Sequence, residues 1–171
     1  MSFLLFLAAS LIQDDGFEAF AKADGWQIAR SGSGCLMVRE FGGSGNTILT
    51  LLIDPALDDT PLRLILGNSA WPVSQTDDSG YVIWFKGSGA TWPDLVGRRF
   101  ASENEDGSVD GVISLAFTQE AMTPVLEDLA ASSGLRLSRR EATISEVNFD
   151  GAEAAIQSLG RCVAALPEAL D

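Results

Sequence analysis

The sequence predicts an α+β fold, in which an antiparallel β-sheet meander of about five to eight strands carries two amphipathic helices. Short runs rich in β-branched and aromatic residues dominate the chain from Trp26 onward. The turn-rich segments between these runs are too short for the crossovers that parallel strands need. Two later segments carry apolar residues at helical spacing. No linker interrupts the chain, so residues 14–171 are expected to form a single domain.

The first strands are expected in five consecutive runs: "GWQIAR", "CLMVREF", "NTILTLLID", "PLRLILG" and "YVIWFKG". Before them, Phe17, Phe20 and Ala21 have helical spacing and predict one or two helical turns. After them, Thr91 and Asp94 in "TWPDLVG" have the spacing of a capping box and predict one short turn. Further strands are expected in "RRFA", "VISLAF", "LRLSRR" and "ATISEVNF".

The first of the two helices is predicted from an apolar stripe formed by Met122, Val125, Leu126, Leu129 and Ala130. Thr123-Pro124 is the strongest start signal, although Thr118 offers an earlier cap. Gly134 supplies the stop signal.

The second helix is predicted in "FDGAEAAIQSLGRC", near the C-terminal end. Asp150 and Glu153 have capping-box spacing, and Pro167 limits the other end. One face of this helix is apolar: Ala152, Ala155, Ile156, Leu159, Cys162, Val163 and Leu166. Cys162 is therefore expected to point toward the core.

The two cysteines predict a disulfide. Cys35 begins the strand "CLMVREF", and Cys162 lies on the helix stripe expected to pack against that sheet. A pair with no cysteine left over is typical of oxidising compartments. The alternative is two free cysteines buried as small core residues.

An apolar segment from Phe3 to Ile12 precedes an acidic stretch at the start of the chain. It is too short to span a bilayer and resembles the hydrophobic region of a signal peptide, with the small residues Ala8, Ala9 and Ser10 near a cleavage point. Residues 1–13 are therefore expected to be a signal peptide, and the protein to be periplasmic or secreted. The alternative is a buried N-terminal strand or helix.

The chain is acidic, with 11 Lys+Arg against 24 Asp+Glu and a net charge of −13. This charge disfavours binding to nucleic acid or to an anionic membrane. Arg98-Arg99 and Arg139-Arg140 are the only basic clusters. Adjacent residues in a strand point to opposite faces, so we expect these arginines to be solvated or ion-paired.

Composition excludes several catalytic chemistries. The chain has no histidine, which removes Ser-His-Asp and Cys-His nucleophile systems and histidine-bearing metal sites. It also has no G-x-S-x-G, S-x-x-K, phosphate-binding P-loop or C-x-x-C motif. A carboxylate-dependent hydrolase remains, with candidates Asp54, Asp58, Asp59, Asp77 and Asp78. These residues all lie in turn-rich stretches where acidic side chains are common, so a non-catalytic protein is favoured.

Residues 106–114, "DGSVDGVIS", are the best local match to a metal site. Asp106, Ser108 and Asp110 match early oxygen ligands of a Ca²⁺ loop, but Phe117 stands where a closing bidentate Glu belongs. Two Asp-Gly pairs are also typical of hairpin turns. The sequence favours the turn, and no cofactor is expected.

Trp71, Trp84 and Trp92 are candidates for a ligand-binding platform, because aromatic residues cluster in this part of the chain. On alternating strands, such residues more often pack in the core and at sheet edges. We favour the packing role.

The strand-rich body, "FTQEAMTPVLEDLAASSGLRLS" and the closing "FDGAEAAIQSLGRC" together resemble small exported proteobacterial proteins and, distantly, the invasion-associated locus B family. The resemblance spans residues 25–165, although this chain has only two cysteines. It implies an exported β-rich domain that is linked to host-cell interaction in pathogens and has no catalytic residues to carry over. We therefore predict an exported, non-catalytic domain that binds a protein partner in the envelope or supports an envelope structure. The alternative is the carboxylate-dependent hydrolase, with a bound hard cation.

Overall fold

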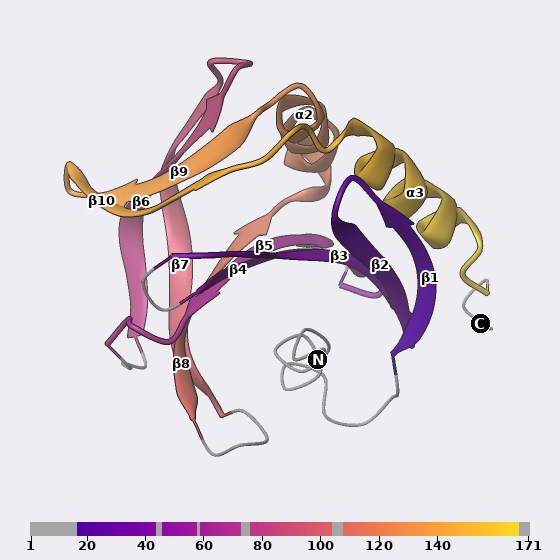
Figure 1. The fold of residues 1–171 in the computed structure, drawn as a ribbon, viewed down its shortest axis with the longest axis horizontal. Coiled ribbons are helices and arrows are strands. Elements are labelled where there is room, and N and C mark those ends of the chain that lie inside the picture. Colours follow the sequence, from indigo (N-terminus) through magenta and orange to yellow (C-terminus); the bar gives the residue numbers. More distant parts are fainter. Residues whose placement is uncertain (1–16, 44–45, 58, 73–75, 104–107, 168–171) are drawn as a thin grey trace.

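The computed structural model describes residues 17–43, 46–57, 59–72, 76–103 and 108–167. Within them, ten strands form one antiparallel sheet in the order β1-β2-β3-β4-β5-β8-β7-β6-β9-β10, with two helices packed on it (Figure 1). Along the chain the elements are β1 (Glu18–Ala23), β2 (Trp26–Ser31), β3 (Gly34–Phe41), β4 (Thr47–Ile53), β5 (Leu62–Asn68), β6 (Thr76–Lys86), β7 (Thr91–Glu103), β8 (Val109–Phe117), α2 (Gln119–Ala130), β9 (Gly134–Arg139), β10 (Ala142–Asn148) and α3 (Glu153–Ala164). The architecture is mainly β with two helices and is compatible with the α+β class, but it has more strands than predicted.

Two segments predicted as helical turns are strands. Glu18–Ala23 pairs with β2 as an edge strand, and Thr91 begins β7, where Trp92 pairs with Ile83 of β6. A helix of one or two turns is marginal on its own, because few hydrogen bonds offset the cost of nucleating it. Pairing with a neighbouring strand therefore makes both segments strands rather than helical turns.

The predicted meander holds only from β2 to β5, which β1 extends at one edge. The strand that follows β5 in the sheet is β8 rather than β6. Strands β7 and β6 come next in the sheet, so the order of β6, β7 and β8 in space is the reverse of their order along the chain. Helix α2 then connects β8 to β9, which pairs with β6. Turn chemistry specifies which strands form a hairpin, but it does not specify which edge of the sheet the hairpin joins.

The two edge strands of the sheet are irregular. The β1–β2 pairing shifts register between Ala19 and Ala21, and the β9–β10 pairing shifts between Thr143 and Ser145. Each shift is a bulge that bends its strand and interrupts the regular hydrogen-bond ladder.

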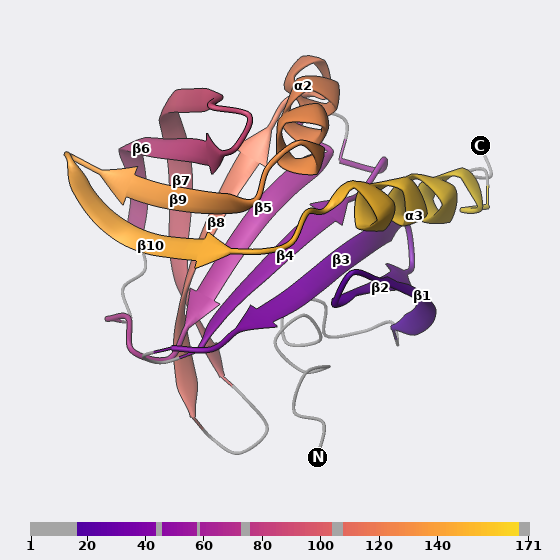
Figure 2. The same ribbon diagram turned by 45° about the horizontal axis from the view of Figure 1, so that its top comes forward.

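The sheet curves around one face, which we call the first face, and both helices pack against it (Figures 1 and 2). On the central strands the buried first-face residues are Cys35, Met37, Leu49, Leu51, Ile53, Leu62, Leu64 and Leu66. The ring of Phe149, just after β10, lies 5.7 Å from that of Trp26 and 6.2 Å from that of Phe41. These aromatic contacts join the last strand to the first strands, so the core is closed across the curve of the sheet.

Helix α2 begins earlier than its strongest sequence signal predicted. The Thr118 hydroxyl accepts a hydrogen bond from the Ala121 N–H at 3.4 Å, so Thr118 is the N-cap and Pro124 lies inside the helix. Helix α3 lies where it was predicted, but its expected cap is wrong. Ala152 occupies the N-cap position without a side-chain hydrogen bond. None of the described helices is long and apolar enough to cross a membrane.

A disulfide joins Cys35 of β3 to Cys162 of α3, as the sequence predicted. The two Cα atoms are 6.1 Å apart, and both residues are fully buried. Helix α3 therefore lies with its apolar stripe on β1, β2 and β3.

Replacing Leu159 with Ala is expected to lower the free energy of unfolding by about 2–5 kcal/mol, because the lost side chain leaves a cavity in the core. Leu159 is 0% exposed. Urea denaturation measures the change. The exposed Gln157 on the same helix is the matched control, and Gln157→Ala should change stability by less than about 0.5 kcal/mol. Equal effects from the two substitutions would contradict the packing of α3 on the sheet.

Removing the disulfide with Cys35→Ala/Cys162→Ala is expected to lower the free energy of unfolding by about 4–5 kcal/mol in the chain-entropy model. The bond closes a loop between residues 127 positions apart. Denaturation under oxidising and reducing conditions measures the loss. Reduction should lower the free energy of unfolding of the original protein, and it should not change that of the double variant. Labelling of two thiols in the unfolded, unreduced protein from its native compartment would contradict the bond.

Candidate functional site

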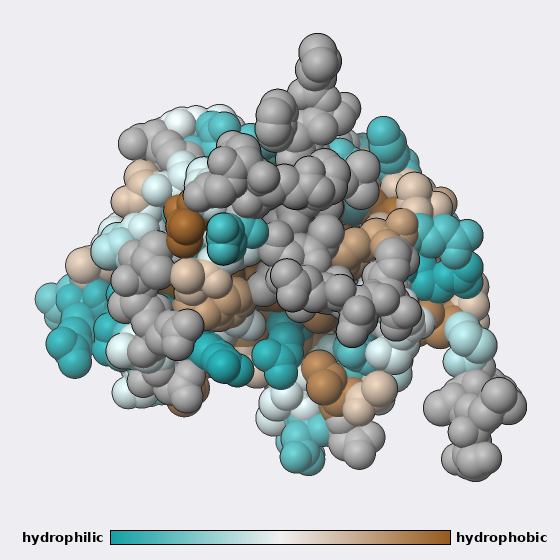
Figure 3. Space-filling model, turned by 90° about the horizontal axis from the view of Figure 1, so that it is seen from below, coloured by the Kyte–Doolittle hydropathy of each residue, from teal (hydrophilic) through white to brown (hydrophobic). Residues whose placement is uncertain are grey.

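The face of the sheet opposite α2 and α3, which we call the second face, is also apolar over β2–β5. In β3, β4 and β5 apolar residues occupy both alternating sets of positions, a pattern typical of strands buried on both sides. The apolar second-face residues are Ala29, Leu36, Val38, Ile48, Leu52 and Ile65. Hydrophobic surface is visible among hydrophilic surface on this side of the molecule (Figure 3).

Strand register brings two arginines onto this face. Leu36 pairs with Leu52, and Leu52 pairs with Arg63 of β5. In the adjacent row, Ile65 pairs with Ser114, and Ser114 pairs with Arg98 of β7. Neighbouring strands lie about 4.8 Å apart, so the backbones of β5 and β7 are separated by only about 10 Å.

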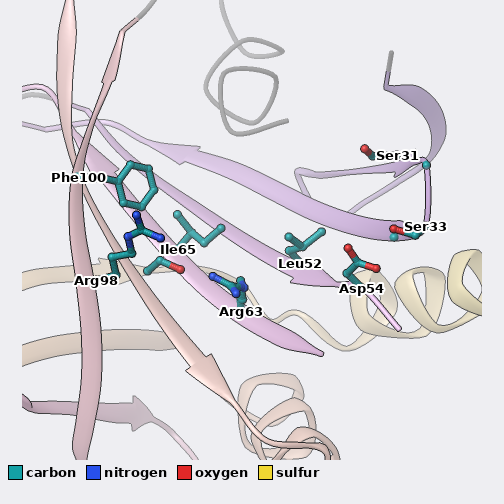
Figure 4. Close-up of a pocket in the computed structure, with 11 residues that line it drawn as sticks. Ser31, Ser33, Leu52, Asp54, Arg63, Ile65, Arg98 and Phe100 are labelled. Carbon is teal, nitrogen blue, oxygen red and sulfur yellow. The ribbon is translucent and has the colours of Figure 1, made fainter. Parts of the chain in front are cut away.

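Arg63 and Arg98 line one cavity of about 490 Å³, which we call the arginine cavity (Figure 4). Eight of its lining residues are labelled in Figure 4: Ser31, Ser33, Leu52, Asp54, Arg63, Ile65, Arg98 and Phe100. Arg98 and Phe100 lie at one end, and Asp54 lies at the other. The volume falls within the usual range for small-molecule sites, which combine apolar walls with a few convergent polar groups.

In the part of the chain that the structure describes, no carboxylate forms an ion pair with either arginine of this cavity. The Nε of Arg63 is buried and has no hydrogen-bond acceptor, and neither Arg63 nor Arg98 forms an ion pair with any residue that the structure describes. A buried donor left without an acceptor costs about 1–3 kcal/mol. Asp54, the one carboxylate among the described lining residues, instead accepts the Ala56 N–H at 3.1 Å. Among the described lining residues, two cations therefore stand against one carboxylate, and no ion pair joins that carboxylate to either arginine.

Two other arginines, Arg99 and Arg139, bind groups of the protein itself. Arg139 Nη1 lies 2.9 Å from Asp78 Oδ2, and Arg99 Nε donates to the Tyr81 hydroxyl at 2.9 Å. Arg99 also lies 3.8 Å from Asp78. These two arginines are partnered as the sequence predicted, whereas Arg98, beside Arg99 in the chain, faces the cavity.

Among the described candidate carboxylates, only Asp54 lines the arginine cavity. Asp54 lines the cavity, Asp59 is exposed between β4 and β5, and Asp78 lies on β6, three strands away from β5. Asp58 and the side chain of Asp77 lie outside the described residues. A carboxylate pair for glycoside hydrolysis requires a separation of roughly 5–9.5 Å.

The candidate Ca²⁺ ligands lie at the β7–β8 connection. Asp106 is outside the described residues, Ser108 is exposed, and Asp110 is buried on β8, where it pairs with Ser102. Antiparallel pairing of β7 with β8 makes the connection a hairpin. Among the described residues, no group of three or more acidic or cysteine side chains is placed to hold a metal ion.

The three candidate tryptophans make separate contacts. Trp71 packs on Gly111, where an added Cβ would lie 2.8 Å from the Trp71 Cβ. The Arg136 guanidinium lies 4.9 Å from the ring centroid of Trp84. Trp92 Nε1 donates to Asp128 Oδ2 on α2 at 2.8 Å. The described contacts do not gather them into one platform.

Sequence reasoning missed Arg63 and Arg98 as site residues. The available signal was "LRLIL", in which a single cation interrupts a strand that is otherwise apolar on both faces. Comparisons with family models, curated proteins and solved structures find no match to this chain. Functional inference therefore rests on the geometry of the arginine cavity.

Proposed function

We propose that this protein is an exported, non-catalytic binding domain that holds an anionic ligand in the arginine cavity. One observation carries the proposal: Arg63, whose Nε is buried without a hydrogen-bond acceptor, lines the same cavity as Arg98. Guanidinium groups present fixed pairs of N–H donors that match carboxylate, sulfonate and phosphate oxygens. An anion between these side chains would therefore meet two guanidinium groups that no described carboxylate pairs with.

The overall charge of the chain makes this cavity distinctive. With a net charge of −13, the protein repels anions over most of its surface. The arginine cavity has two cations and one carboxylate among its described lining residues, so its local balance is positive. An anion is attracted there, and the surrounding acidic surface favours selectivity over general anion binding.

Export is supported by two features of the chain. Residues 1–13 have the apolar-to-acidic character of a signal peptide, and Cys35 and Cys162 form a disulfide of the kind that persists in oxidising compartments. A binding domain in the envelope or outside the cell would meet its ligand there.

Titration with the anionic fluorophore 1-anilinonaphthalene-8-sulfonate tests the site. The full chain is expected to bind it, and Arg63→Met and Arg98→Met should each weaken binding by roughly 10–100-fold, because a hydrogen bond to a charged group contributes about 1.5–3 kcal/mol. Arg140, exposed in the β9–β10 turn, is the matched control, and Arg140→Met should leave affinity unchanged. Near-ultraviolet circular dichroism checks that each variant is folded. The same affinity in all three folded variants would contradict the proposal.

A further inference from the structure

We infer that the ligand of the arginine cavity is an anionic single-chain amphiphile whose hydrocarbon tail lies across the second face toward β1. This inference rests on the proposed function, because it assigns the anionic head group to Arg63 and Arg98. It adds the chemical class of the remainder of the ligand.

A second cavity, of about 240 Å³, lies on the same face between β1, β2 and β3. We call it the tail cavity. Its walls are mainly apolar and include Phe20, Leu36 and Val38, with Lys22 and Gln27 as the two polar residues of the described lining. It therefore offers hydrocarbon contacts but few groups to hold a charge.

The floors of the two cavities are continuous. Leu36 lines the tail cavity, Leu52 lines the arginine cavity, and the two residues pair directly across β3 and β4. Side chains that are paired in this way have Cβ atoms about 4.5–5.5 Å apart. Leu52 also packs against the cluster formed by Ala29, Leu36 and Val38. A chain leaving the arginines along this row meets apolar side chains without interruption.

The spacing of the strands sets the length of the tail. Arg63 on β5 and Ala29 on β2 are three strand steps apart, which is about 14 Å. An extended hydrocarbon chain advances roughly 1.25 Å per carbon for C–C bonds of about 1.5 Å. A tail of about eleven or twelve carbons therefore spans the distance.

A free amphiphile fits these features better than a membrane surface. The net charge of −13 opposes contact with an anionic bilayer, whereas a single molecule can place its head group between the two arginines. Compact anions would satisfy the arginines but leave the tail cavity and its apolar floor unused.

The test is calorimetric titration of the full chain with octanoate, decanoate, dodecanoate and tetradecanoate below their micellar concentrations. Affinity should rise by about fourfold for each added methylene up to dodecanoate and then level off, because longer chains exceed the apolar row. Dodecyl phosphate tests the other common anionic head group, and binding of either head supports the inference. Neutral dodecanol should bind at least about tenfold more weakly than dodecanoate, since it cannot match the guanidinium charges.

Val38→Thr keeps the side-chain shape but adds a hydroxyl to the tail cavity. It should weaken dodecanoate binding by roughly fivefold or more and leave binding of the compact anion benzenesulfonate unchanged. Val96, 63% exposed on β7 and outside the described lining of both cavities, is the matched control. Val96→Thr should alter neither affinity.

The outcomes separate this inference from the proposed function. Binding of benzenesulfonate that depends on Arg63, together with an affinity for fatty acids that does not depend on chain length, would overturn the amphiphile assignment and leave the anion site in place. Failure of the full chain to bind any of these anions would overturn both proposals.

Discussion

The packing of α3 on β1–β3 is the contact on which the arrangement of the molecule depends. Leu159 and Cys162 are buried against the first face, and the bond to Cys35 holds the end of the chain against its early strands. Phe149 reinforces this closure through its aromatic contacts with Trp26 and Phe41. Because these contacts fill the first face with the protein's own side chains, a ligand is left with the second face. The position of the candidate site thus follows from the way the core is closed.

Local sequence patterns predicted the elements better than their arrangement. The apolar stripe containing Leu159 placed α3 correctly, and the position of Cys162 on that stripe predicted its disulfide partner. The order of the strands could not be predicted from the sequence, because the β6–β7–β8 segment pairs with β5 through β8, its last strand. That choice is made by side-chain packing between segments far apart in the chain. The start of α2 was ambiguous for a local reason, since both Thr118 and Pro124 are good signals near a helix N-terminus.

The candidate site was hidden from sequence reasoning because it depends on register. Arg63 and Arg98 belong to different hairpins, and they share a face only because β8 pairs with both β5 and β7. Paired arginines in an acidic chain had suggested solvated or ion-paired side chains, and this describes both residues: Arg99 is ion-paired, and Arg98 is exposed where it lines the cavity. The tryptophans drew attention as large aromatic groups, and in the structure Trp84 lies beside Arg136 while Trp92 donates to Asp128. A more informative feature was that β3, β4 and β5 do not alternate between apolar and polar residues, so both of their faces are mainly apolar.

The bulges in β1 and β10 have a consequence for how this protein can recognise other molecules. The sheet has two ends, and an unbroken edge strand would offer evenly spaced backbone groups to any extended peptide. Bulges at both ends disrupt that row and disfavour recognition through the main chain. Recognition on the second face depends instead on individual side chains such as Arg63 and Val38. Such a surface can change its preference one residue at a time, while the hydrogen bonds that hold the strands together stay intact.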